Sequence, residues 1–161
     1  MARGSGEQGT WLITIREDRA IPVDGLVLGY GAMLPFPVAA VAVWVGGGEV
    51  AAAAATLAIL LGAALALFLS GVRRGLSFRT EGGPRPGQIA MMLWLFAVGL
   101  AALLIPERPA IALLAAVFLS LLILDPIAAR RGEVPLYFAR LRPPQMAIPV
   151  LSLLAIFAGR A

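Results

Sequence analysis

Long apolar runs separated by arginine-rich stretches are the feature that most limits how this chain can fold. A helix needs about 20 mostly apolar residues to cross the hydrocarbon core of a bilayer. Hydrophobic residues make up 60% of the 161 residues, whereas a soluble domain has roughly 45–50%. The fold class predicted is an all-α membrane protein, a five-transmembrane-helix bundle (residues 25–161) after a short polar segment (residues 1–24). The five spans are expected at about residues 26–45, 50–69, 89–105, 110–124 and 145–158.

The arginines predict how the chain is oriented in the membrane. All 13 basic residues are arginines, and eleven of them fall in the N-terminal segment and in two stretches, residues 70–88 and 124–142. In a five-span protein these three regions lie on one side, while Arg108 and Arg160 lie on the other. Short loops rich in basic residues stay in the cytoplasm. We therefore expect a multi-pass protein of the bacterial inner membrane with a cytoplasmic N-terminus.

The chain contains no cysteine and no histidine. Disulfides, iron–sulfur clusters and thiolate metal sites are thereby excluded, and the commonest ligand of haem, zinc and copper is missing. No cofactor is expected. No acid or arginine lies in the middle of a predicted span, which argues against an ion-coupled transporter and against an enzyme. The formal charge of +4 is concentrated in loops, and it favours anionic lipid headgroups over nucleic acid as partners.

Small residues predict where helices approach one another closely. Gly25 and Gly29 stand four residues apart at the start of the first apolar run, and the alanine-rich second run contains Gly62 and Ala66. Residues without a bulky side chain let neighbouring backbones come close in a membrane. We expect these four positions to lie at helix contacts, with the second helix at the centre of the bundle.

Proline should interrupt the first helix. Pro35 and Pro37 each remove a backbone donor, so they kink this helix or break it into two pieces. A broken helix can mark a transporter site, but a packing kink is favoured because no charge lies nearby. Asp125 follows the fourth run, and an ion pair with Arg130 or another arginine of the 124–142 stretch is favoured over a catalytic role.

Arginines and an aromatic residue flank the ends of several apolar runs. Arginine beside aromatic residues is typical of a cytoplasmic membrane interface. The residues expected to anchor the chain there, in contact with lipid headgroups, are Arg73, Arg74, Tyr137, Arg140 and Arg142.

The polar N-terminal segment contains one patterned stretch. Trp11, Ile13 and Ile15 alternate with other residues, as in a short strand. The favoured interpretation is a tail anchored at the headgroups through Trp11. The alternative is a segment that docks on a partner through these three side chains.

Three motifs resemble the family called domain of unknown function 3429. The motifs lie at residues 67–76 (LFLSGVRRGL), 122–126 (LILDP) and 135–142 (PLYFARLR). The resemblance extends from Gly25 to the C-terminus. Family members often have Trp in place of Arg74 and Arg in place of Pro126. The resemblance implies a five-helix inner-membrane protein related to mitochondrial transmembrane protein 69, and it implies no catalytic residue.

These features predict a non-catalytic inner-membrane protein. The expected role is an accessory, scaffold or assembly subunit beside a larger energy-converting complex, either respiratory or photosynthetic. Two alternatives stay open. One is a small oligomeric channel or carrier in which the broken first helix lines a path. The other is a lipid-binding membrane protein whose arginine loops hold phosphate headgroups.

Overall fold

The regular structure of the chain is helical throughout the part that can be described. The computed structural model describes residues 23–80 and 82–160, without the side chain of Asp24. The predicted all-α fold is confirmed for this part. Trp11, Ile13 and Ile15 lie outside the described residues. The helices are α1 (Val23–Gly31), α2 (Pro35–Val45), α3 (Gly48–Ser77), α4 (Pro86–Ala102), α5 (Glu107–Arg130) and α6 (Phe138–Gly159).

Four helical segments are long and apolar enough to cross a membrane. They are Gly25–Val45, which combines α1 and α2, and the helices α3, α5 and α6. Helix α4 is also apolar but has only 17 residues. The chain is therefore a multi-pass membrane protein.

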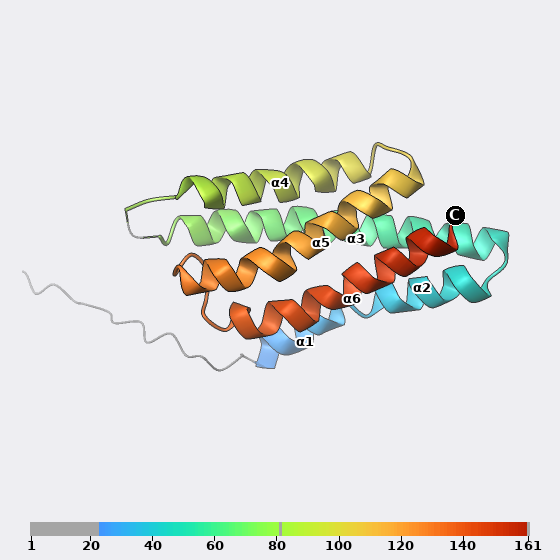
Figure 1. Cartoon of the computed structure of the whole chain (residues 1–161), viewed down its shortest axis with the longest axis horizontal. Helices are drawn as coiled ribbons and strands as arrows, with labels where there is room; N and C mark the ends of the chain where they lie inside the picture. Colours follow the sequence, from blue (N-terminus) through green and yellow to red (C-terminus); the bar gives the residue numbers. More distant parts are fainter. Residues whose placement is uncertain (1–22, 81, 161) are drawn as a thin grey trace, which may run out of the picture.

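The helices run along one common long direction, so that their connections gather at the two ends of the bundle (Figure 1). The α3–α4 and α5–α6 connections lie at the end where α1 begins. The α2–α3 and α4–α5 connections lie at the opposite end, together with the C-terminus. Both arginine-rich stretches therefore meet at one end, which we call the arginine end.

The helices at the arginine end are longer than the apolar runs. Helix α3 continues to Ser77, α5 continues to Arg130, and α6 already begins at Phe138. Much of residues 70–88 and 124–142, expected as loops, is thus helical. Arginine is a good helix former. The expectation of loops was wrong for these helical residues because it followed hydrophobicity alone, and the bounds of the membrane spans stay predictions.

Prolines explain where the chain breaks. Residues 32–34 separate α1 from α2, and Pro35 opens α2, where a proline costs no intrahelical hydrogen bond. The predicted interruption of the first helix is thereby confirmed. Pro126 lies inside α5, and Pro143, Pro144 and Pro149 lie inside α6. Interior prolines are tolerated in membrane helices when neighbouring groups satisfy the freed carbonyls.

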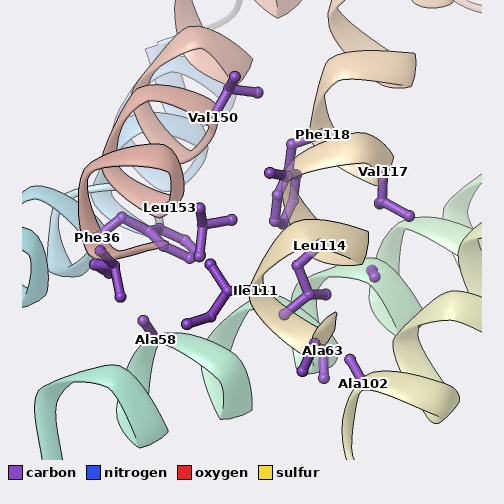
Figure 2. Packing of buried hydrophobic residues seen from close by; sticks show 14 of the residues in the cluster. Phe36, Ala58, Ala63, Ala102, Ile111, Leu114, Val117, Phe118, Val150 and Leu153 are labelled. Carbon is purple, nitrogen blue, oxygen red and sulfur yellow. The ribbon is translucent and has the colours of Figure 1, made fainter. Parts of the chain in front are cut away.

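Apolar side chains of the helices α2 to α6 form one buried core. Phe36 meets Phe118 edge to face, with 5.8 Å between the ring centroids. Ile111 of α5 and Leu153 of α6 lie beside this aromatic pair (Figure 2). All four side chains are fully buried. Trp44 of α2 closes the contact with α6 by donating a hydrogen bond of 3.0 Å to the carbonyl of Ala155.

Candidate functional site

Three charged side chains from three helices meet inside the arginine end of the bundle. Arg73 comes from α3, Asp125 from α5 and Arg142 from α6. Only 6%, 1% and 7% of their respective surfaces are exposed. We call these three residues the charged cluster. They sit close to their helix ends rather than at the middle of the spans, but they are as buried as the apolar core.

Helical periodicity turns these side chains inward. In α3, the buried face runs through Gly62, Ala66, Leu69, Arg73 and Ser77, at spacings of three or four residues. Residues at such spacings lie on one face of a helix. Arg73 therefore continues the face that packs against the other helices.

Asp125 accepts ion pairs on both carboxylate oxygens. Arg73 donates to its Oδ1, and the Nε of Arg142 lies 3.2 Å from its Oδ2. This second contact lacks hydrogen-bond geometry, and neither atom has another partner among the described residues. The guanidinium of Arg142 also lies over the ring of Phe138, 4.5 Å from its centroid. Cation–π contact and Coulomb attraction together offset part of the desolvation cost.

The charged cluster has a net charge of +1, because two arginines pair with one carboxylate. Burying an ion without a matching partner is costly. The next acid in this region, Glu133, pairs with Arg85 at 3.4 Å. The arrangement can thus hold helices together, and it can attract an anion.

Gln145 extends the charged cluster to the first helix. Its Oε1 accepts a hydrogen bond of 3.4 Å from the Nη1 of Arg142. Its Nε2 donates a hydrogen bond of 2.8 Å to the carbonyl oxygen of Gly29. The last carbonyls of a helix have no intrahelical donor, so Gln145 satisfies a group that the break before Pro35 leaves free.

A cavity of about 300 Å³ lies beside the charged cluster, between α1, α3 and α6. Arg142 and Gln145 supply its polar edge, and most of the remaining lining is apolar, including Leu28, Leu65 and Phe68. We call it the Arg142 groove. It is a space with one cationic edge and apolar walls.

A second buried amide joins the two connections at the arginine end. Gln88 donates to the hydroxyl of Thr80 at 2.9 Å and to the carbonyl of Glu133 at 3.3 Å. Its Oε1 accepts from the backbone N–H of Arg85 at 2.9 Å. The α3–α4 connection is thereby fixed to the α5–α6 connection.

The comparison with known families bears on nearly all of the described chain. The family model described as "Protein of unknown function (DUF3429)" matches residues 21–158. The chain belongs to this family. All three residues of the charged cluster, Gln145 and the Arg142 groove lie within the matched range. Neither a curated protein nor a solved structure matches the chain.

The four small residues expected at helix contacts have different surroundings. Gly29 lies against the side chain of Gln145, and a Cβ on Gly62 would come within 3.0 Å of Leu114. Ala66 is fully buried in the core. Gly25 is half-buried and lines the Arg142 groove.

The five residues expected at the membrane interface are split between surface and interior. Arg140 is exposed, and Arg74 is half-buried with its guanidinium 4.1 Å from the centroid of the Phe78 ring. Tyr137 is half-buried and packs on Phe138. Arg73 and Arg142 instead point into the bundle and meet Asp125. They were expected at the surface because arginine near aromatic residues at the end of an apolar run is typical of a membrane interface, but helical phase turns them inward.

Part of this site could be predicted from the sequence. The expected ion pair between Asp125 and an arginine of residues 124–142 is confirmed with Arg142. The second partner, Arg73, comes from the other arginine-rich stretch and was missed. Gln145 and Gln88 were missed too. The sequence did contain one indication: a polar residue spaced three or four positions from small or apolar residues on the same helical face. Arg73 has this spacing to Ala66 and Leu69.

Proposed function

We propose that this chain is a non-catalytic integral membrane protein that serves as an accessory, scaffold or assembly subunit of a larger energy-converting complex. It crosses the inner membrane five times with its N-terminus in the cytoplasm. Arg74, Tyr137 and Arg140 contact anionic headgroups at the cytoplasmic face, and no nucleic acid takes part.

This proposal rests mainly on one observation: the buried charged side chains pair with one another. Arg73, Asp125 and Arg142 pair with one another across α3, α5 and α6. Each is engaged in holding helices together, and the pairing engages both oxygens of the carboxylate. Charged groups placed inside a membrane protein usually mark function, and here the supported function is a fixed arrangement of helices.

Five crossings require that α4 spans the bilayer as well. Its 17 residues extend for about 25 Å at 1.5 Å per residue, a few ångströms less than the hydrocarbon core of about 30 Å. Residues 103–105, which continue as a turn, add to this length. The gathering of both arginine-rich stretches at one end supports a cytoplasmic location for that end.

The choice of an energy-converting complex rests on the resemblance to inner-membrane proteins of bacteria and mitochondria. The family itself is one of unknown function, so the membrane and the complex are part of the proposal. Such a complex is respiratory or photosynthetic.

Photo-crosslinking in native membranes tests this proposal. Leu57 of α3 is exposed and lines an apolar cavity of about 460 Å³ between α2 and α3. Leu154 of α6 is exposed and lines a cavity of about 250 Å³ between α5 and α6. A photoreactive residue placed at each position in turn should give, from at least one position, a discrete adduct with another membrane protein. Mass spectrometry then identifies the partner.

A matched control uses Arg140, which is exposed at the arginine end. The same photoreactive residue there should react with lipid. Gentle extraction through an affinity tag should recover the crosslinked partner in constant ratio to the chain. Adducts with lipid alone from all positions, and recovery of the chain without a stoichiometric partner, would overturn the proposal.

A further inference from the structure

We propose that the Arg142 groove binds one anionic phospholipid, whose phosphate meets Arg142 while an acyl chain lies against α1 and α3. This inference does not depend on the partner complex. It follows from the charge of the cluster, the free edge of Arg142 and the apolar walls of the groove.

The first step is the charge balance. Two arginines share one carboxylate in the interior, which leaves one positive charge without a counter-ion. Glu133 lies on the Arg73 side, where it lines a cavity together with Arg73 and pairs with Arg85. Among the described side chains no acid lines the Arg142 groove, so the excess charge is on the Arg142 side. A single phosphodiester carries one negative charge and so balances the cluster.

The second step is the geometry of Arg142. Its Nε faces Asp125, and its Nη1 donates to Gln145. Its Nη2 has no partner among the described residues, and the side chain lines the groove. Arginine holds phosphate oxygens through charge-assisted hydrogen bonds. Tyr137 lines the same groove and adds a hydroxyl.

The third step is the shape of the ligand. Leu28 and Phe68 line the groove and are 72% and 65% exposed, so the groove opens toward the surroundings of the helices. In a membrane these surroundings are acyl chains. Arg142 lies in the second turn of α6, near the arginine end, and in the proposed orientation this end faces the headgroups. A free phosphate ion could bind at the cationic edge but would make no contact with the apolar walls. A phospholipid can contact both, so it fits the groove better.

The test compares binding of a monoanionic phospholipid, phosphatidylglycerol, with binding of zwitterionic phosphatidylcholine. The full chain is purified in detergent, delipidated and titrated, and native mass spectrometry counts bound lipids while thermal unfolding follows stability. We expect one tightly retained phosphatidylglycerol and a rise in melting temperature with its concentration, because a ligand that binds the folded state stabilises it. Inorganic phosphate should give neither effect at millimolar concentration.

Arg142→Gln is the decisive variant. It leaves Arg73 and Asp125 as a balanced pair, so the protein should fold. Its affinity for phosphatidylglycerol should fall by about tenfold or more, as expected when a hydrogen bond to a charged group is lost. The matched control Arg140→Gln removes the same charge two residues away on an exposed side chain and should stay within about twofold of wild type, since exposed charges contribute little.

A second variant keeps the charges and fills the groove. Leu65→Trp places a larger side chain in the lining, and its control, Leu60→Trp, adds the same ring at an exposed position of α3. Leu65→Trp alone should lose the retained lipid. Equal binding by Arg142→Gln and wild type, an equal loss in Arg140→Gln, or equal stabilisation by inorganic phosphate would each overturn the inference.

Discussion

Gln145 in α6 donates a hydrogen bond of 2.8 Å to the carbonyl oxygen of Gly29 in α1. The two residues are 116 positions apart, and this bond is the polar link between the first helix and the rest of the bundle that the described residues provide. It exists because residues 32–34 interrupt the helix before Pro35. The interruption leaves carbonyl oxygens of α1 without their backbone donors. The buried amide of Gln145 takes the place of one missing donor.

Replacing Gln145 with Leu should loosen α1 selectively. The change leaves the Gly29 carbonyl without its donor, at a cost of about 1–3 kcal/mol for an unsatisfied buried group. Amide hydrogen exchange should speed up in α1, whose contacts with the bundle are otherwise few. Exchange in α5 should remain unchanged.

Gln88→Leu provides the matched control for that experiment. Gln88 is equally buried, but it bonds Thr80, Arg85 and Glu133 in the connections at the arginine end. Its loss should raise exchange around residues 78–88 and leave α1 alone. Faster exchange in α1 for both variants would show that α1 responds to general destabilisation rather than to the Gln145 bond.

Gly99→Ala should destabilise the α3–α4 contact. An added Cβ would lie 3.1 Å from the Cγ of Leu67 and 3.2 Å from both the carbonyl oxygen of Ala63 and the Cβ of Ala66. Leu67 can shift, but the two alanine atoms belong to or adjoin the α3 backbone, so we expect a loss of about 1–3 kcal/mol, typical of overpacking. Equilibrium unfolding in mixed micelles measures the difference.

The control for Gly99 is Gly71→Ala in α3. Gly71 is exposed, and a Cβ there meets nothing within 4 Å. Alanine is the better helix former, so this variant should gain about 0.5–1 kcal/mol. If both variants shift stability in the same direction, close packing at Gly99 is not what determines the effect.

The ion pair between Arg160 and Glu107 should contribute far less than the charged cluster. Its closest atoms are 2.6 Å apart, but both side chains are 29% exposed, and salt and water screen such pairs. Arg160→Gln should therefore leave the unfolding midpoint unchanged. The hydrogen bond with Glu107 raises the pKa of Arg160, so its contribution is present below the normal arginine pKa and is lost only above the raised one. Stability should show no step from this pair between neutral and mildly alkaline pH, and such a step would contradict this assignment.

The helical architecture could be predicted because bilayer thickness fixes the length of an apolar run. The first two runs, residues 26–45 and 50–69, reach that length, and Pro35 marks the break in the first. The ends of the helices could not be read from hydrophobicity. Arg73 and Arg142 are strongly polar, yet α3 and α6 continue through them, since a buried ion pair replaces the water they lose.

The spacing of Arg73 to Ala66 and Leu69 could have predicted that its side chain points into the bundle. Its partner could not be predicted, because helical phase shows which face is buried but not which other helix covers that face. The meeting of Arg73, Asp125 and Arg142 depends on how α3, α5 and α6 pack. The Gly29–Gln145 bond depends on packing in the same way, so only the three-dimensional arrangement identifies it.

Buried charges hold α3, α5 and α6 together, and the unfolding free energy of two cluster variants tests this most directly. Asp125→Asn leaves two buried arginines without their anion and should cost about 3–5 kcal/mol. The triple variant Arg73→Met, Asp125→Leu, Arg142→Met removes all three charges, and it should recover most of that loss because apolar replacement of a buried ionic group by residues of similar volume is often tolerated. A near-neutral Asp125→Asn, or a triple variant as unstable as the single one, would contradict the account.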